Sequence, residues 1–278
     1  MQLVLSEARK QRSFREVWVG YLLAILLLSA FIYSDSEGLE YGGWYFIQQD
    51  IHRYVGVLTA FLLVIGLSRL MCYETEQRTA GLIGTAAHGS ALTWRAKAGL
   101  SILYCTAIVF VLGAVTLGIR GALIGFQDAF TPVSECIHFE NVPLSNLAYC
   151  IVQYGFLLLG ALYFTGFILI VATLTKRTSF TIFLCGGIYL ASLCYQFVIE
   201  NRLNGPAAKI CKAIFQFSFC GFMQLERVRK NHMDVEWHEY TDENGKNTPV
   251  INASITEKAS IIGRVGIMFL SCGTGARR

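Results

Sequence analysis

The sequence predicts an all-α polytopic membrane protein, and three observations carry that prediction. First, 54% of the 278 residues are hydrophobic and only 15% are charged, whereas soluble domains carry roughly 25% charged residues. Second, several apolar runs are long enough to cross a bilayer as helices. Third, the basic residues gather in alternate connections between these runs, as in multi-pass membrane proteins.

The apolar runs set the number of spans. A helix needs about 20 apolar residues to cross roughly 30 Å of hydrocarbon, and helices satisfy their backbone hydrogen bonds in lipid without outside partners. Five runs are clear, at 17–33, 54–72, 98–119, 147–173 and 180–199. A shorter run at 259–272 is the sixth. We expect one transmembrane domain over residues 1–278, with spans one to five inside 17–199 and span six plus the tail at 259–278.

The distribution of basic residues predicts the orientation of the spans. Lysines and arginines lie before span one, between spans two and three, between spans four and five, and after span six: Arg9, Lys10, Arg12, Arg15; Arg78, Arg95, Lys97; Lys176, Arg177; Arg277, Arg278. The connection between spans one and two is instead acidic. Cytoplasmic loops are the ones enriched in Lys and Arg, so both termini are expected in the cytoplasm. Arg120 is expected at the outer end of span three, where it can reach the lipid headgroups.

Two segments outside the predicted spans, 1–16 and 200–258, have their own patterns. Residues 1–16 combine apolar residues with charged, mainly basic ones, which fits an amphipathic helix on the inner surface; a solvated basic flank is the alternative. Residues 200–258 are expected to form a small outer cap. Within it, 213–225 is apolar but too short to span, which favours a re-entrant or interfacial element. The phenylalanines of this stretch would suit a strand equally well. An Asn-Gly turn near 244 separates two alternating runs and indicates a β-hairpin.

The inner connection between spans two and three is the most informative stretch, and it reads YETEQRTAGLIGTAAHGSALTWRAK over 73–97. Its carboxylates, Glu74 and Glu76, suit the N-terminus of a helix. Leu82 and Ile83 then begin an apolar face at helical spacing. A short helix with such a ridge can enter a groove on a cytosolic partner. An ordinary inner loop resting on lipid is the alternative.

This segment resembles the signature of type-2 ABC exporter permeases (the ABC-2 family), in the form common in Gram-positive bacteria. The family pattern is roughly E-Y-E-x-G-T-x-x-L-I-x-S-T-x-x-G-R, closing with A-K. The matching positions are Glu74, Glu76, Thr79, Leu82, Ile83, Thr85, Gly89, Ala96 and Lys97. The chain departs from the pattern at Arg78, where the family has glycine, and at Ser90, where it has arginine.

The resemblance implies a function for the whole chain. It would be the permease subunit of an ATP-driven exporter in a bacterial plasma membrane, paired with a second permease copy as a homo- or heterodimer. Residues 74–89 would be the coupling helix that rests on a separate ABC ATPase subunit, which would hold the ATP and Mg²⁺. No cofactor is expected on this chain, because it contains no G-x-x-x-x-G-K-[ST] phosphate loop. The chain itself is therefore not expected to be an enzyme.

The sequence also allows functions other than transport. His232, Asp234, Glu236 and His238 are spaced by two and would share one face of a strand. These residue types bind zinc or similar metals, which would suit a membrane-embedded metal-dependent enzyme. A half-exposed strand shows the same alternation without any metal. A non-catalytic sensor or scaffold is a further alternative. A secondary transporter is disfavoured by the lack of midplane carboxylates, and nothing indicates nucleic-acid binding.

Overall fold

The computed structural model describes residues 2–35, 43–79, 89–133, 144–202, 210–211, 214–215, 217–224, 233–241 and 247–255. It is mostly helical. Five helices are long and apolar enough to cross a membrane: Arg15–Ser34, Phe46–Glu76, Ala91–Ile124, Asn146–Thr175 and Thr178–Tyr195. The prediction of a multi-pass helical membrane protein is confirmed at this level. The expected sixth span, 259–272, lies outside the described residues.

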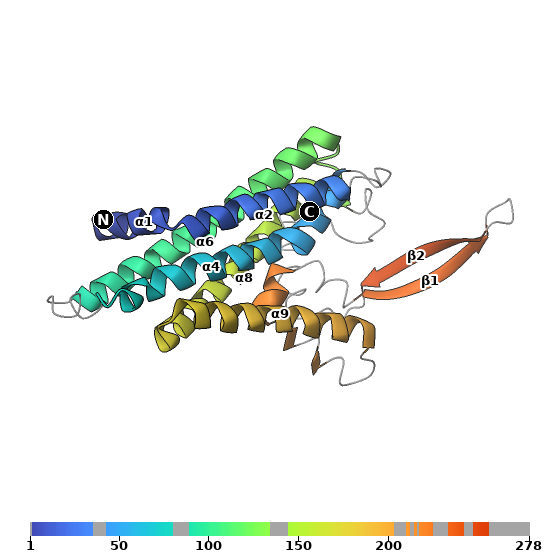
Figure 1. Ribbon diagram of the computed structural model, residues 1–278. Helices are drawn as coiled ribbons and strands as arrows, with labels where there is room; N and C mark the ends of the chain where they lie inside the picture. Colours follow the sequence, from blue (N-terminus) through green and yellow to red (C-terminus); the bar gives the residue numbers. More distant parts are fainter. Residues whose placement is uncertain are drawn as a thin grey trace, which may run out of the picture.

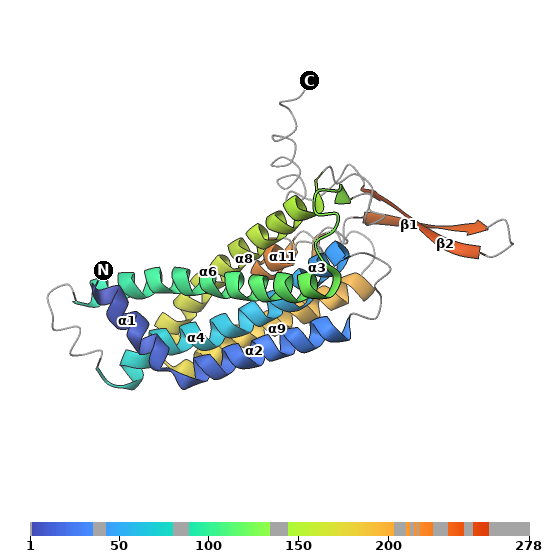
Figure 2. The same ribbon diagram turned by 90° about the horizontal axis from the view of Figure 1, so that it is seen from above.

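Figures 1 and 2 show how the elements are arranged. In chain order they are α1 (Gln2–Ser13), α2 (Arg15–Ser34), α3 (Gly43–Asp50), the π-helical turn η2 (Ile51–Val55), α4 (Gly56–Glu76), α6 (Gly89–Ile124), α8 (Asn146–Thr175), α9 (Thr178–Arg202), α11 (Phe219–Met223), β1 (Met233–Thr241) and β2 (Asn247–Ile255). The helix α8 begins at the N-cap Ser145, whose hydroxyl accepts from Ala148 N–H, and it ends at Lys176 in the left-handed conformation.

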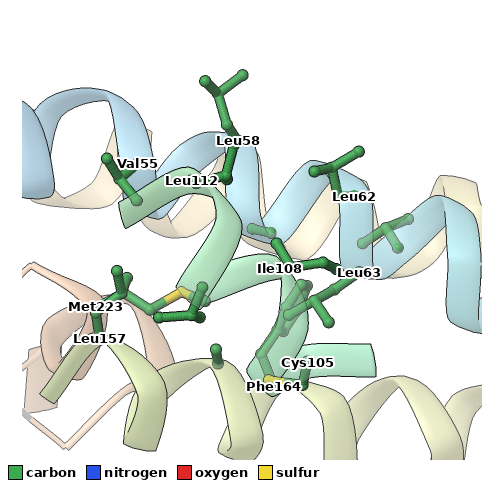
Figure 3. Close-up of a cluster of buried hydrophobic side chains, with 14 of the residues drawn as sticks. Val55, Leu58, Leu62, Leu63, Cys105, Ile108, Leu112, Leu157, Phe164 and Met223 are labelled. Atoms are coloured by element: carbon green, nitrogen blue, oxygen red, sulfur yellow. The ribbon is translucent and has the colours of Figure 1, made fainter. Parts of the chain in front are cut away.

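The helix α4 lies at the centre of the bundle. It contacts α2, α6, α8 and α9, and most of its side chains are buried. Figure 3 shows the core where α4 meets its neighbours: Leu63 of α4, Ile108 of α6 and Phe164 of α8 point toward one another. All three side chains are fully buried. Because α4 is enclosed on several sides, its apolar residues hold the other spans together.

The outward faces of the surrounding helices are apolar. Leu22 of α2, Phe110 of α6, Leu159 of α8 and Phe183 of α9 are more than half exposed. A soluble protein rarely exposes a continuous apolar surface of this kind. The surface is instead what a bilayer covers, so the side-chain arrangement agrees with the membrane-length helices.

The second span begins earlier than the sequence predicts. Helical structure runs unbroken from α3 through η2 into α4, so the span starts at Phe46 rather than at 54. Its first turns carry polar residues, including Gln48 and His52, which the bundle buries almost completely. Hydropathy alone excludes such residues from a span, because it cannot foresee that neighbouring helices shelter them.

The N-terminal segment forms a helix rather than an unstructured basic flank. The helix α1 packs against α6 and also touches α2 and α4. Its residues Glu7 and Gln11 are buried against these helices, and Phe14, which follows it, is buried beside Tyr73. One side of α1 therefore rests on protein at one end of the bundle.

The short helix α11 lies inside the opposite half of the bundle. Phe219 packs against Phe164 of α8 with the two rings tilted and 4.7 Å between their centroids, and Met223 is buried beside Leu157. Gly160 of α8 permits this approach, because a Cβ there would lie 2.7 Å from Met223 N and 2.9 Å from Phe219 O. This apolar segment thus packs within the helices without crossing the bundle.

The strands β1 and β2 pair antiparallel, with Met233 opposite Ile255 and Thr241 opposite Asn247. In both ribbon views they lie beyond the end of the bundle opposite α1. The expected turn at 242–245 falls outside the described residues. The remainder of the segment assigned to an outer cap is described only in parts.

Replacing Gly160 by alanine should destabilise the bundle, because the added methyl group would collide with the backbone of α11. Overpacking of this kind typically costs about 1–3 kcal/mol. Gly155→Ala is the matched control on the same helix, since a Cβ there meets nothing within 4 Å, and it should be neutral or stabilising. Thermal unfolding in detergent measures both. Equal stability of the two variants would contradict the packing of α11 against α8.

Candidate functional site

A network of charged residues occupies the end of the bundle where α1 lies. Its centre is Glu74 in the last turn of α4, which is almost completely buried. Lys97 Nζ, from the first turns of α6, lies 2.9 Å from Glu74 Oε2. Lys97 is also buried. This ion pair joins the two helix ends that flank the undescribed segment 80–88.

The helix α1 adds a second pair of charges to this network. Lys10 Nζ lies 2.6 Å from Glu7 Oε1 and 3.1 Å from Glu74 Oε1. Two carboxylates thus meet two ammonium groups, and the cluster is neutral in sum. Burial opposes the charged form of Lys10, but its hydrogen bonds to Glu7 and Glu74 outweigh this effect and raise the pKa of Lys10. Three helices are therefore tied together at one point.

Glu76 connects the same end of α4 to α9. Its Oε1 accepts a hydrogen bond of 2.7 Å from Thr178 N–H at the first residue of α9. A carboxylate is favourable at a helix N-terminus, where the backbone N–H groups are unpaired. Its Oε2 accepts from Arg69 Nη1 at 3.2 Å, and the Arg69 guanidinium also lies over the rings of Phe14 and Tyr73.

The structure corrects the expected position of the two carboxylates. Glu74 and Glu76 do not begin a helix; they end α4, at the terminus where negative charge is unfavourable. Lys97 and Arg69 offset that cost for Glu74 and Glu76 respectively. Glu76 does face a helix N-terminus, but that of α9. The sequence could not assign this, because α9 lies about a hundred residues further along the chain.

The other residues of the predicted coupling helix have different outcomes. Thr79 follows α4, where its hydroxyl donates to Glu74 O at 3.2 Å. Gly89 is the first residue of α6. Leu82, Ile83 and Thr85 lie outside the described residues. Glu74 stands near the beginning of the family pattern and Lys97 at its end, and the fold brings their side chains into contact.

A second buried ion pair lies at the opposite end of the spans. Arg120 of α6 donates from Nε to Asp50 Oδ2 at 2.7 Å and from Nη2 to Asp50 Oδ1 at 3.0 Å. Both side chains are buried, and the guanidinium also lies over the ring of Phe46. The expectation that Arg120 reaches the headgroups is therefore wrong. Asp50, which the sequence assigns to an outer loop, lies in the second span and neutralises it.

The spacing of the two pairs fits a bilayer. Asp50 and Glu74 are 24 residues apart on one continuous helical segment, which corresponds to about 36 Å. Arg120 and Lys97 are separated by nearly the same length on α6. The hydrocarbon core is roughly 30 Å thick, so both pairs fit at its boundaries. Between them the only formal side-chain charges on these two helices are Arg53 and Arg69, each close to one end.

The candidate metal-binding face is only partly described. His232 lies outside the described residues, whereas Asp234, Glu236 and His238 alternate along β1 opposite Ser254, Asn252 and Val250. The equal parity of their positions places them on one face of the two-stranded ribbon. Among the described residues, no group of three or more His, Cys, Asp or Glu side chains is arranged to hold a metal ion.

Sequence reasoning missed the partners of Glu74 and Arg120. Glu7 and Lys10 carry a signal, because opposite charges three residues apart face each other on a helix. Asp50 and Arg120 carry a weaker one: each lies about one turn from the outer end of its helix, and a charge in such a position favours an opposite charge nearby.

Comparison of the chain with protein families, with characterised proteins and with solved structures finds no match.

The Asp50–Arg120 pair should show strong coupling in a double-mutant cycle. Removing one partner leaves the other buried and uncompensated, which typically costs about 3–5 kcal/mol. We expect Asp50→Asn and Arg120→Met each to destabilise the protein severely, and the double variant to recover part of the loss. Thermal unfolding in detergent is the measurement. Arg53→Met is the control, because in its 3.7 Å pair with Asp35 the side chains are 46% and 36% exposed, and the pair should contribute under about 1 kcal/mol.

The Glu74–Lys97 pair should be coupled in the same way, to a smaller extent. Glu74 retains Lys10 when Lys97 is lost, so we expect Lys97→Met to cost roughly 1–3 kcal/mol. The triple variant Glu74→Gln/Lys97→Met/Lys10→Met should be less destabilised than the sum of its single changes. Strict additivity in thermal unfolding would show that the three residues do not act as a unit.

Proposed function

We propose that this chain is the membrane-spanning permease subunit of an ATP-driven exporter of the ABC-2 type. A separate ATPase chain would supply the energy, and a second permease copy would complete the transporter. The observation that carries the proposal is the Glu74–Lys97 ion pair. It joins the two ends of the segment whose sequence resembles the family signature.

This contact suits a segment that transmits force. A partner that displaced residues 80–88 would pull on α4 and α6 together, because their ends are linked to each other and, through Lys10, to α1. The hydrogen bond from Thr178 to Glu76 extends the link to α9. Since α4 contacts most of the other spans, motion at this end would reach much of the bundle.

The arrangement of basic residues supports a cytoplasmic position for this end. Lys10, Arg15, Arg69, Lys97, Lys176 and Arg177 all lie toward the α1 end of the helices, whereas Arg53 and Arg120 lie toward the other. By the positive-inside rule the α1 end faces the cytoplasm, in a bacterial plasma membrane. The helix α11 would then be a re-entrant element, and the β1–β2 ribbon part of a small outer cap before a sixth span.

The distribution of charge also supports an external energy source. Carriers driven by ions place ionisable residues near the middle of the membrane. In the described spans, the buried charged pairs lie near the helix ends instead. The carboxylate of Asp50 is held by two hydrogen bonds from Arg120, which suits a fixed contact better than a site that exchanges protons.

A pull-down of the tagged, detergent-solubilised chain tests the proposal. We expect a soluble ATPase to remain bound, and to be lost when Leu82 and Ile83 are both changed to aspartate, because a charged ridge cannot enter an apolar groove. Leu92→Asp is the matched control, since this leucine is exposed on α6 near the same end but outside 80–88, and binding should persist.

Two results would contradict the proposal. Purification without any ATPase, together with bound metal that is lost on His232→Ala, would favour the metal-dependent enzyme. Retention of the ATPase by the Leu82→Asp/Ile83→Asp variant, with correct membrane insertion, would exclude the coupling role of this segment.

A further inference from the structure

A groove lies at the α1 end of the bundle, between the end of α4 and the beginning of α9. Its volume is about 530 Å³, within the range of roughly 300–1,000 Å³ found for ligand pockets. The hydrogen bond from Thr178 N–H to Glu76 holds the two helix ends together, and Figure 1 shows both of them at this end of the bundle. The residues that line the groove are Glu76, Arg177, Ser179, Phe180 and Phe183.

The lining carries two opposite charges that do not neutralise each other. Arg177 is exposed and makes no ion pair in the part of the chain that the structure describes. Glu76 accepts one hydrogen bond at each carboxylate oxygen, from Thr178 N–H and from Arg69, and its side chain is still 29% exposed. A carboxylate can accept about four hydrogen bonds, so Glu76 can accept more from the groove. A ligand with one negative and one positive group would match both charges.

The remaining part of the groove is apolar. Phe180 and Phe183 are both more than half exposed, and their spacing of three residues places them on one stripe of α9. Phe183 is five residues beyond the start of α9, which is about 8 Å along the helix. Glu76 lies just beyond Glu74, whose ion pair fits the inner boundary of the hydrocarbon core. The charged part of the groove is therefore at the depth of the headgroups, and the aromatic part extends into the hydrocarbon.

We propose that this groove, which we call the α4–α9 groove, binds one phosphatidylethanolamine molecule of the surrounding membrane. The phosphate lies against Arg177 and the hydroxyl of Ser179, and the ammonium group donates hydrogen bonds to Glu76. An acyl chain lies along Phe180 and Phe183.

The two charges of the lining select this headgroup. A headgroup with only a negative charge would be repelled by the nearby carboxylate of Glu76. A trimethylammonium group, as in phosphatidylcholine, has no N–H to donate to that carboxylate, whereas a primary ammonium group has three. The proposal does not depend on transport or on an ATPase partner, so the failure of either leaves the other standing.

Native mass spectrometry of the purified full chain tests the site with phosphatidylethanolamine, phosphatidylcholine and phosphatidylglycerol as probes. We expect one phosphatidylethanolamine to remain bound per chain, about tenfold more tightly than phosphatidylcholine, because only its ammonium group can form a charge-assisted hydrogen bond. Glu76→Gln should reduce this preference to about twofold or less, while its amide oxygen can still accept from Thr178 N–H. Glu16→Gln is the matched control, because Glu16 is exposed near the same end of the bundle and does not line the groove, and the preference should persist.

The phosphate contact has its own test. Arg177→Gln should weaken the binding of all three lipids about fivefold, whereas Lys176→Gln should change it less than about twofold, since Lys176 is exposed beside Arg177 but does not line the groove. Ser179→Asp should also weaken binding, because it places a carboxylate against the phosphate, and the first turn of a helix accommodates that charge.

Three results would overturn the proposal. The first is equal binding of phosphatidylethanolamine and phosphatidylcholine by the unsubstituted chain. The second is a preference for phosphatidylethanolamine that Glu76→Gln leaves unchanged. The third is tighter binding of phosphatidylglycerol than of phosphatidylethanolamine, because the groove would then recognise an anion alone.

Discussion

Charged groups must stay near the boundaries of the hydrocarbon core, and this constraint fixes much of the bundle. The continuous helix Phe46–Glu76 carries a buried carboxylate toward each end, and α6 supplies a basic partner for each of them. The two pairs are about 36 Å apart along the helix, so they also set the register of α6 against α4. A slide by one turn would break both pairs and leave buried charges uncompensated.

The two ion pairs differ in what surrounds them. Asp50 and Arg120 are joined by two parallel hydrogen bonds and are both buried, which suits a rigid contact. Glu74 instead shares two lysines from two different helices, and one of these lysines is more than a third exposed. A shared, partly hydrated network can exchange partners with less loss of free energy. The end of the bundle beside segment 80–88 is thus the end that can rearrange more easily.

Several features could be predicted from residues close together in the sequence. The five membrane-length helices follow from apolar runs, and the helix at 2–13 follows from its amphipathic pattern. The bounds of the second span could not be predicted, because Gln48, Asp50 and His52 are buried only when α6 and α8 cover them. The helical start assigned to Glu74 and Glu76 failed for a similar reason, since their partners Lys97 and Thr178 come from other helices.

The sequence by itself determined the class of the protein: a chain too apolar for water, with spans of fixed length and basic residues in alternate connections. Those properties depend on local composition and on the thickness of the bilayer, which need no knowledge of contacts. Only the tertiary structure decided which charges neutralise one another and how α1 joins the network at Glu74. These contacts join residues up to a hundred positions apart, and hydropathy and helical periodicity hold no information on such pairings.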